Sequence, residues 1–185
     1  MDRLDPSTTL ILVVDVQEKL AAAMPEESVA TVVKNTGILL EAARVLGVDV
    51  LASEQYPKGL GPTVPAIAEK LGPLGVTPMA KMTFDACSDL AIARAISDIA
   101  PRSVVVVGME SHVCVFQTAR ELVKRGYTTH VVADGVASRR EENRRLGLSL
   151  CERAGAIITA TETVAFDLLG QAGTDAFKAV SKLVR

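Results

Sequence analysis

Six short apolar runs, rich in β-branched residues, alternate along this chain with longer segments of helical spacing. The runs that we expect to be strands are residues 9–16, 48–53, 75–80, 103–108, 128–134 and 156–161. The expected helices are 28–46, 88–99, 114–125 and 140–154, with a further short helix over 171–185. Strands that alternate with helices are typical of a parallel sheet covered on both faces by right-handed crossovers. The pattern therefore predicts an α/β fold: a three-layer α/β/α sandwich around a six-stranded parallel sheet, Rossmann-like in topology.

Length and composition limit the classes of function. At 185 residues, with no linker-like change in composition, the chain is expected to form one domain over residues 1–185. The formal net charge is −2 and aromatic residues make up 3%, which argues against a nucleic-acid partner. No apolar stretch reaches the roughly 18 residues that a membrane span needs. The first run is interpreted as a strand rather than a signal peptide, and three widely spaced cysteines do not form a disulfide framework. We therefore expect a cytoplasmic protein without a membrane partner.

The residues that follow the strands are the first candidates for function, because ligands of such sheets bind at the carboxyl ends of the strands. Asp15 follows the first run and Lys81 follows the third. Cys114 lies six residues after Gly108, where the fourth run stops and a helix begins. Taken alone, each has a plainer explanation: a helix cap for Asp15, a surface lysine for Lys81 and core packing for Cys114. Together they are expected to converge at one edge of the sheet.

Cys114 is a candidate nucleophile. A thiol attacks as the thiolate, and a helix N-terminus, an ammonium group or a neighbouring base favours that form. We therefore expect a lowered pKa for Cys114, beside a loop whose amides converge on an oxyanion. Cys87 and Cys151 have no strand-end acid beside them in the sequence and are interpreted as packing residues.

Other kinds of site are weakly supported. His112 is too close in sequence to Cys114 to be placed easily as its general base, and His130 lies inside a strand pattern as an expected satisfied core residue. The chain has no G-x-S-x-G motif, no zinc-binding cluster and no G-x-G-x-x-G after the first run, so we expect neither metal nor cofactor. The run 138–147 mixes charge signs at helical spacing and is interpreted as a solvated helix face.

The long Pro- and Gly-rich segment 56–67 follows the second run, where a substrate lid is expected. The residues that we expect to line a pocket for a small-molecule substrate are Gln17, Gln55, Tyr56, Phe84 and His112. The last segment, 171–185, is a candidate arm for a homo-oligomer, as a dimer or a larger assembly.

Three motifs carry a resemblance to a known family over about residues 8–168. They are "LILVVDVQEKL", "MAKMTFDA" and "VVVVGMESHVCVFQTA", which contain the strand-end acid, lysine and cysteine in that order. The chain resembles the isochorismatase-like cysteine hydrolases, which include nicotinamidases and related amidases. The resemblance implies a catalytic triad of Asp15, Lys81 and Cys114. It also implies a cis peptide bond between Met109 and Glu110, and an oxyanion hole formed by the backbone amides of Glu110 and Cys114.

One departure from the nicotinamidases bears on the substrate. They carry a metal-binding cluster of Asp and His after the second strand, where this chain has "ASEQYPKGLGPT". This form is similar to the metal-free branch of isochorismatase-domain proteins. The resemblance therefore implies a hydrolase of a small amide or related C–N bond that works through a Cys114 thioester, with Asp15 as general acid and base and Lys81 supporting the thiolate. The alternative is a redox-sensing or non-catalytic module of the same fold.

Overall fold

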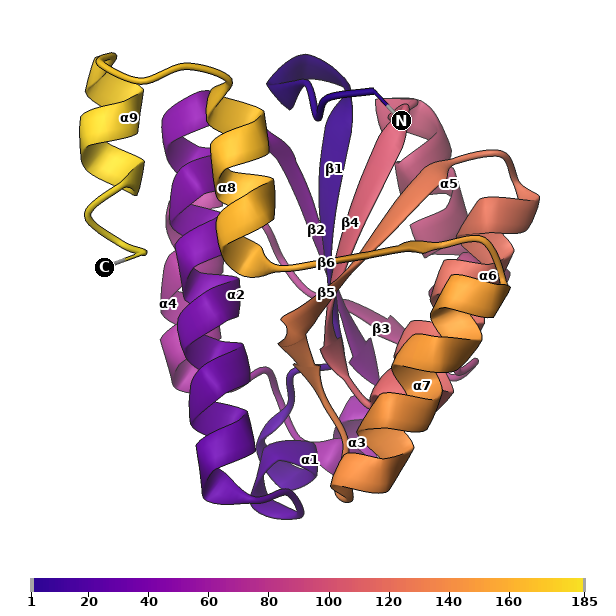
Figure 1. The fold of residues 1–185 in the computed structure, drawn as a ribbon. Coiled ribbons are helices and arrows are strands. Elements are labelled where there is room, and N and C mark those ends of the chain that lie inside the picture. The colour runs from indigo at the N-terminus through magenta and orange to yellow at the C-terminus, as the bar shows by residue number, and fades with distance from the viewer. Residues whose placement is uncertain (1, 185) are drawn as a thin grey trace.

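The computed structural model describes residues 2–184, which form a six-stranded sheet between two layers of helices (Figure 1). All strands are parallel, and their order across the sheet is β3-β2-β1-β4-β5-β6. The strands are β1 (Thr9–Val14), β2 (Asp49–Gln55), β3 (Met79–Lys81), β4 (Ser103–Met109), β5 (Thr128–Ala137) and β6 (Ile157–Thr159). This is the expected three-layer α/β/α sandwich with Rossmann-like strand order.

The helices cover both faces of the sheet, as Figure 1 shows. One face carries α2 (Glu26–Leu46), α4 (Pro65–Leu71) and α8 (Thr161–Leu169). The other carries α5 (Leu90–Ile99), α6 (Phe116–Lys124) and α7 (Glu141–Arg153). Two short helices, α1 (Glu18–Ala22) and α3 (Pro57–Leu60), lie at the carboxyl ends of the strands, and α9 (Asp175–Val180) packs outside α2.

The central strand β1 explains why the sheet is buried on both sides. Successive side chains of a strand point to opposite faces. Ile11 and Val13 accordingly join the core under α2, whereas Leu10, Leu12 and Val14 join the core under α5 and α6. Each such side chain contributes about 1.5–3 kcal/mol when it is fully removed from water. A strand that is apolar at every position is thus stable only at the centre of a three-layer fold.

All six expected strands are present, with shifted ends, but several helices were not expected. The segment 56–67 contains α3 and the start of α4 rather than a continuous loop, and it is pinned by a β-bridge between Gln17 and Thr63. Pro57 and Pro65 each stand at the start of one of these helices, where a missing N–H costs nothing. The third strand begins only at Met79.

The expectations about the C-terminal part of the chain were incomplete. No helix was expected over α8, whose buried residues nevertheless recur at helical spacing in Val164, Ala165 and Leu168. The last helix packs on its own chain, where Val180 of α9 is buried against Ala42 and Ala165.

The strand order reverses between β1 and β4, which are direct neighbours in register, with Val14 beside Gly108. Gly108 has φ +126°, and a Cβ atom there would collide with the carbonyl oxygen of Val14. A glycine is therefore required for the two backbones to approach so closely. In sheets of this kind the crevice at the reversal point is where ligands bind.

Candidate active site

Asp15 directly follows β1 at this reversal point and is completely buried. Its backbone is in the left-handed region, with φ +52°, a conformation that Asp adopts more readily than most residues. Its carboxylate accepts hydrogen bonds from the Ser53 hydroxyl of β2 at 2.7 Å and from the Lys81 ammonium of β3 at 2.7 Å. A conformation of this kind persists where the surrounding contacts determine it, and such places are often functional sites.

Lys81 ends β3, and its side chain is as buried as that of Asp15, at 0% exposure. Besides Asp15, its Nζ donates to Gln55 Oε1 at 2.8 Å and to the carbonyl oxygens of Thr83 and Phe84 at 3.1 and 3.2 Å. A buried charge is tolerated when it is paired and hydrogen-bonded in this way. The plainer explanation, a surface lysine whose head reaches water, is therefore wrong.

Gln17 and Gln55 form a hydrogen-bond network next to this ion pair. The Gln17 amide accepts from the backbone N–H of Gln55 at 2.7 Å and donates to the Gln55 carbonyl at 3.1 Å, so it pairs with the end of β2 as a strand would. It also donates to the Gly61 carbonyl at 2.6 Å. Gln55 in turn holds Lys81 and donates to the Met82 carbonyl at 2.9 Å. Both glutamines are buried, and their polar atoms are used within the chain.

Cys114 lies in a π-helical turn, Ser111–Val115, that continues into α6. In an α-helical turn the carbonyl of Glu110 would accept from the amide of Cys114. Here it accepts from Val113 at 3.1 Å and from Val115 at 3.2 Å. The wider turn thus moves the Cys114 amide out of the usual hydrogen-bond ladder, a feature frequent at functional sites. The helical segment begins three residues before the cysteine, earlier than expected.

Cys114 is 5% exposed, and its thiol lies near the charges of Asp15 and Lys81. Burial raises the pKa of Cys114 to about 12; the Asp15 carboxylate raises it further by charge and by a hydrogen bond, and the Lys81 ammonium opposes this. The expectation of a lowered pKa was wrong, because burial outweighs the ammonium. The resting group is a neutral thiol, and the neighbouring Asp15 carboxylate is the candidate base for its proton.

The peptide bond between Met109 and Glu110 is cis, as the resemblance implied. The Glu110 side chain is buried and anchors this loop: its carboxylate accepts from the Arg139 backbone amide at 3.0 Å and from Arg139 Nε at 3.1 Å. Arg139 was assigned to a solvated face. Its mixed-charge surroundings gave no signal for this contact, which joins the ends of β4 and β5.

Two of the expected pocket residues are exposed at the surface, next to a third apolar side chain that was not expected there. Tyr56 and Phe84 are 47% and 53% exposed, and Met82, between Lys81 and Phe84 in the chain, is 69% exposed. His112 points away from this group, because its Nδ1 lies 3.0 Å from the Ser138 hydroxyl at the end of β5. Residues two apart on a helical turn face different sides, which explains why His112 and Cys114 separate.

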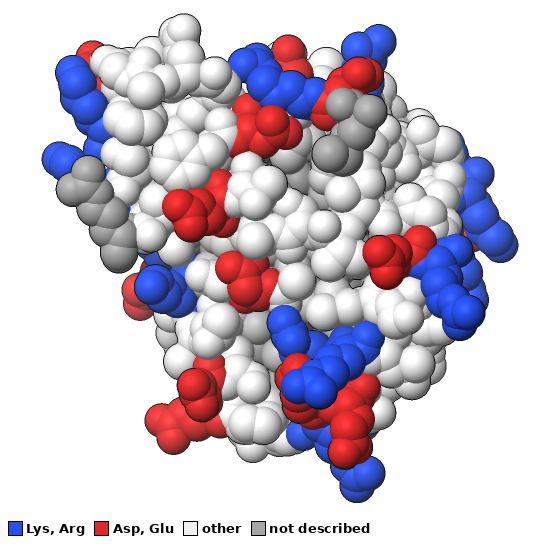
Figure 2. Space-filling view, in the orientation of Figure 1, with Lys and Arg blue, Asp and Glu red and all other residues white. Residues whose placement is uncertain are grey.

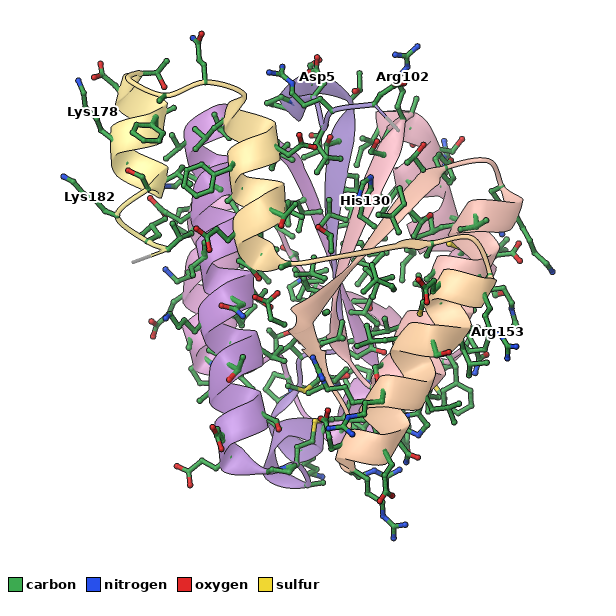
Figure 3. All side chains as sticks on the ribbon, viewed as in Figure 1. Asp5, Arg102, His130, Arg153, Lys178 and Lys182 are labelled. Carbon is green, nitrogen blue, oxygen red and sulfur yellow. The ribbon has the colours of Figure 1, made fainter. Side chains whose placement is uncertain are left out.

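The other cysteines and the second histidine lie in the core. Cys87 and Cys151 are buried and unpaired, and burial raises the pKa of each thiol to about 12. His130 is buried in the half of β5 nearer the amino ends of the strands (Figure 3). The expectation that it is a satisfied residue was wrong, since within residues 2–184 its Nε2 has no hydrogen-bond partner. Burial lowers the pKa of His130.

No helix among residues 2–184 is long and apolar enough to cross a membrane. Within the same residues, no three His, Cys, Asp or Glu side chains lie close enough together to hold a metal ion.

A doubly wound sheet with buried polar side chains at its reversal point places this chain among the Rossmann-like α/β proteins that bind ligands at that point. Comparison with known proteins gives the family: the model of the isochorismatase domain matches residues 9–163, and this chain belongs to the isochorismatase family of hydrolases. Isochorismatase domain-containing protein 2 of Danio rerio is 35% identical over 182 residues, which cover 98% of this chain and 89% of that protein.

Solved structures show the same fold. The MAR1 ribonuclease of Caenorhabditis elegans matches with a TM-score of 0.91 and 35% identity, covering 99% of this chain and 92% of that one. The YcaC gene product of Escherichia coli, described as an octameric hydrolase of unknown specificity, matches with a TM-score of 0.88 and 20% identity. That match covers 98% of this chain and 88% of the other, and at this identity it bears on the fold alone.

Proposed function

We propose that this protein is a cysteine hydrolase that cleaves a small amide or a related C–N bond through a thioester on Cys114. The observation that carries the proposal is the fully buried ion pair of Asp15 and Lys81 beside the Cys114 thiol. A carboxylate held between an ammonium and a thiol has the arrangement of a base that activates a nucleophile.

The first half of the reaction forms the thioester. Asp15 takes the proton of Cys114 as the sulfur attacks the carbonyl carbon of the substrate. The carbonyl oxygen becomes an oxyanion, which the backbone amides of Glu110 and Cys114 stabilise; one such donor is typically worth about 3–4 kcal/mol. Asp15 then delivers its proton to the nitrogen of the leaving amine, and the C–N bond breaks.

The second half releases the acid. Asp15, again ionised, takes a proton from a water molecule that attacks the thioester carbon. The oxyanion forms and collapses in the same place, the C–S bond breaks, and the thiolate recovers the proton. Lys81 keeps the carboxylate in position throughout, because Gln55 and two carbonyl oxygens fix its own Nζ.

The direction of the thiol pKa bears on the alternative. A peroxide-sensing cysteine works as a thiolate and is accessible to its oxidant. Cys114 is buried, with a pKa raised to about 12. A neutral thiol with a carboxylate beside it suits proton transfer during attack better than spontaneous oxidation.

The C. elegans relative is named a ribonuclease, so RNA is a second candidate substrate. Binding of RNA depends on a basic surface that neutralises phosphates. The net charge of this chain is −2, and on the face in Figure 2 Lys and Arg alternate with Asp and Glu instead of gathering in a stripe. We therefore favour a small uncharged substrate.

We also propose that the protein is a homo-oligomer and that residues 1–185 form one domain. Met82, Phe84 and Tyr56 expose large apolar area beside the site, and exposed apolar patches favour contact with another surface. A structural relative is described as an octamer. Light scattering on the purified protein tests the assembly.

A cytoplasmic location fits three buried cysteines that form no disulfide within the described residues.

Intact-protein mass spectrometry tests the reaction. The protein is incubated with a panel of small amides and esters, and with a short RNA in parallel. The expected result is an acyl adduct on Cys114 that turns over to free acid, and its absence from Cys114→Ala. RNA cleavage that survives in Cys114→Ala, without any acyl adduct, would replace this proposal with a different chemistry.

A further inference from the structure

The turn that carries Cys114 is contacted by α7 and by the end of β5, through residues that the catalytic scheme does not use. Gly147 lies in the interior of α7 and is buried. A Cβ atom there would lie 2.5 Å from the carbonyl carbon of Ser111, 2.6 Å from the amide nitrogen of His112 and 2.7 Å from the oxygen of Ser111. The backbone of α7 therefore touches the backbone of the π turn directly, and only glycine permits this contact.

A glycine inside a helix lowers stability by about 0.5–1 kcal/mol relative to alanine, so its presence there calls for a reason. Gly37 in α2 provides a comparison within the same chain. A Cβ atom at Gly37 would meet only the methylene carbons of Lys70, at 3.0 and 3.2 Å, and a flexible side chain can move aside. A Cβ atom at Gly147 would instead meet backbone atoms of Ser111 and His112, which cannot move aside in this way.

Ser138, at the end of β5, makes the second contact. Its buried hydroxyl accepts from the Ser111 amide at 3.1 Å and lies 2.6 Å from the Ser111 hydroxyl and 3.0 Å from His112 Nδ1. One oxygen atom thus joins three groups of the turn. Its neighbour Arg139 holds Glu110, the residue before the turn.

We infer that Ser138 and Gly147 are positioning residues that set the depth of the turn Ser111–Val115, so that the Cys114 thiol faces Asp15. The inference rests on the proposed function and assigns a role to both ends of the mixed-charge run 138–147. Asp15 faces the thiol from the end of β1, whereas Ser138 and Gly147 contact the backbone of the turn from the end of β5 and from α7. Neither touches the substrate or the reacting atoms.

The test measures the rate at which iodoacetamide alkylates each cysteine of the folded protein as a function of pH. Peptide mass mapping after the reaction assigns the rate to each cysteine. Gly147→Ala is expected to slow alkylation of Cys114 at neutral pH by about 100-fold, the cost of a displacement of about 1 Å at a reacting centre. The pH profile of Cys114 should also shift relative to the wild type, while those of Cys87 and Cys151 stay in place, because a displaced thiol no longer feels the charges of Asp15 and Lys81. Gly37→Ala, the matched control, should leave the Cys114 rate within about twofold of the wild type.

A second pair of variants keeps the test decisive if Gly147→Ala does not fold. Ser138→Ala removes one hydrogen-bonding hydroxyl and should slow Cys114 about tenfold, whereas Ser138→Thr restores the hydroxyl and should recover most of the rate. Wild-type rates in both Ser138→Ala and a folded Gly147→Ala would overturn the inference, as would equal changes at Cys87 and Cys151. If wild-type Cys114 reacts no faster than Cys87, the proposed function fails instead.

Discussion

Cys114 and Cys87 have closely similar surroundings and, on our interpretation, opposite roles. Both thiols are buried, both have a pKa raised to about 12 chiefly by burial, and both have a carboxylate and a cation nearby. For Cys114 these are Asp15 and Lys81; for Cys87 they are Asp85 and Arg125. Composition and pKa alone therefore do not separate a nucleophile from a packing residue.

The difference lies in what the charged groups are bonded to. Asp85 uses its oxygens within its own turn, accepting from the Cys87 amide at 2.8 Å and the Ser88 hydroxyl at 2.6 Å. Arg125 donates to the Cys87 carbonyl at 2.8 Å and not to the acid. Asp15 and Lys81, by contrast, join separate strands and bond to each other. The two acids therefore differ in what holds them: Asp85 is bonded within its own turn, whereas Asp15 is bonded to Ser53 and Lys81 on two other strands.

The strongest way to break this comparison is to remove each thiol in turn. Cys114→Ala is expected to lower hydrolysis of the acylating amide or ester by about 10⁴-fold or more, as loss of a covalent nucleophile does. Cys87→Ala should lower the free energy of unfolding by about 1 kcal/mol and leave kcat within about twofold. Steady-state kinetics and urea unfolding measure both. Native activity in Cys114→Ala would refute the mechanism.

Replacing Asp15 and Asp85 should change kcat almost as differently as replacing the two cysteines does. Asp15→Asn keeps the shape but cannot accept the thiol proton, so kcat should fall by about 10²–10⁴-fold, the usual contribution of a general base. Asp85→Asn keeps a side chain that can cap residues 86–88 and should change the free energy of unfolding by less than about 1 kcal/mol, with activity kept. Equal losses of kcat in the two variants would contradict the distinction.

Removing the cations gives a smaller effect whose sign can be worked out. The Lys81 ammonium lowers the pKa of Cys114, so Lys81→Met should raise that pKa and move the alkylation profile of Cys114 to higher pH. We expect a loss of about 10²-fold in kcat, together with lower stability, because a buried carboxylate is left without its partner. Arg125→Met, at a half-exposed residue, should leave the Cys114 profile in place. An unmoved profile in Lys81→Met would show that the ammonium does not act on the thiol.

The smallest expected effect concerns metal. The chemistry assigned to Asp15, Lys81 and Cys114 needs no Lewis acid, so incubation with EDTA should leave turnover unchanged. Activity lost in EDTA and restored by zinc, in a protein whose Cys114 still alkylates normally, would mean that the site depends on a metal ion.

Much of this architecture was predictable from sequence, because short, continuous apolar runs indicate buried strands. Once six parallel strands are inferred, Asp15, Lys81 and Cys114 must end at the same edge of the sheet, and the structure brings them together. The cis peptide bond before Glu110 was expected from the family resemblance, together with the sharp turn that the chain needs after Gly108.

The remaining features depend on packing that a linear pattern does not carry. The direction of the Cys114 pKa follows from how deeply the thiol is buried, which the sequence does not state. Ser138 and Arg139 looked like part of a solvated face because their partners lie about thirty residues away in the chain. Gly147 gave the one available signal, a glycine in the interior of a helical pattern.

The pairing of β1 with β4 has a consequence for the life of the chain before it is folded. Val14 and Gly108 become neighbours only when a strand from the first half of the chain takes its place beside one from the second, a late and entropically costly closure. During synthesis Asp15 emerges long before Cys114, and a nascent or partly folded chain holds a thiol without its base. On the proposed mechanism, amide hydrolysis therefore begins only when the centre of the sheet is complete and brings the thiol to its base.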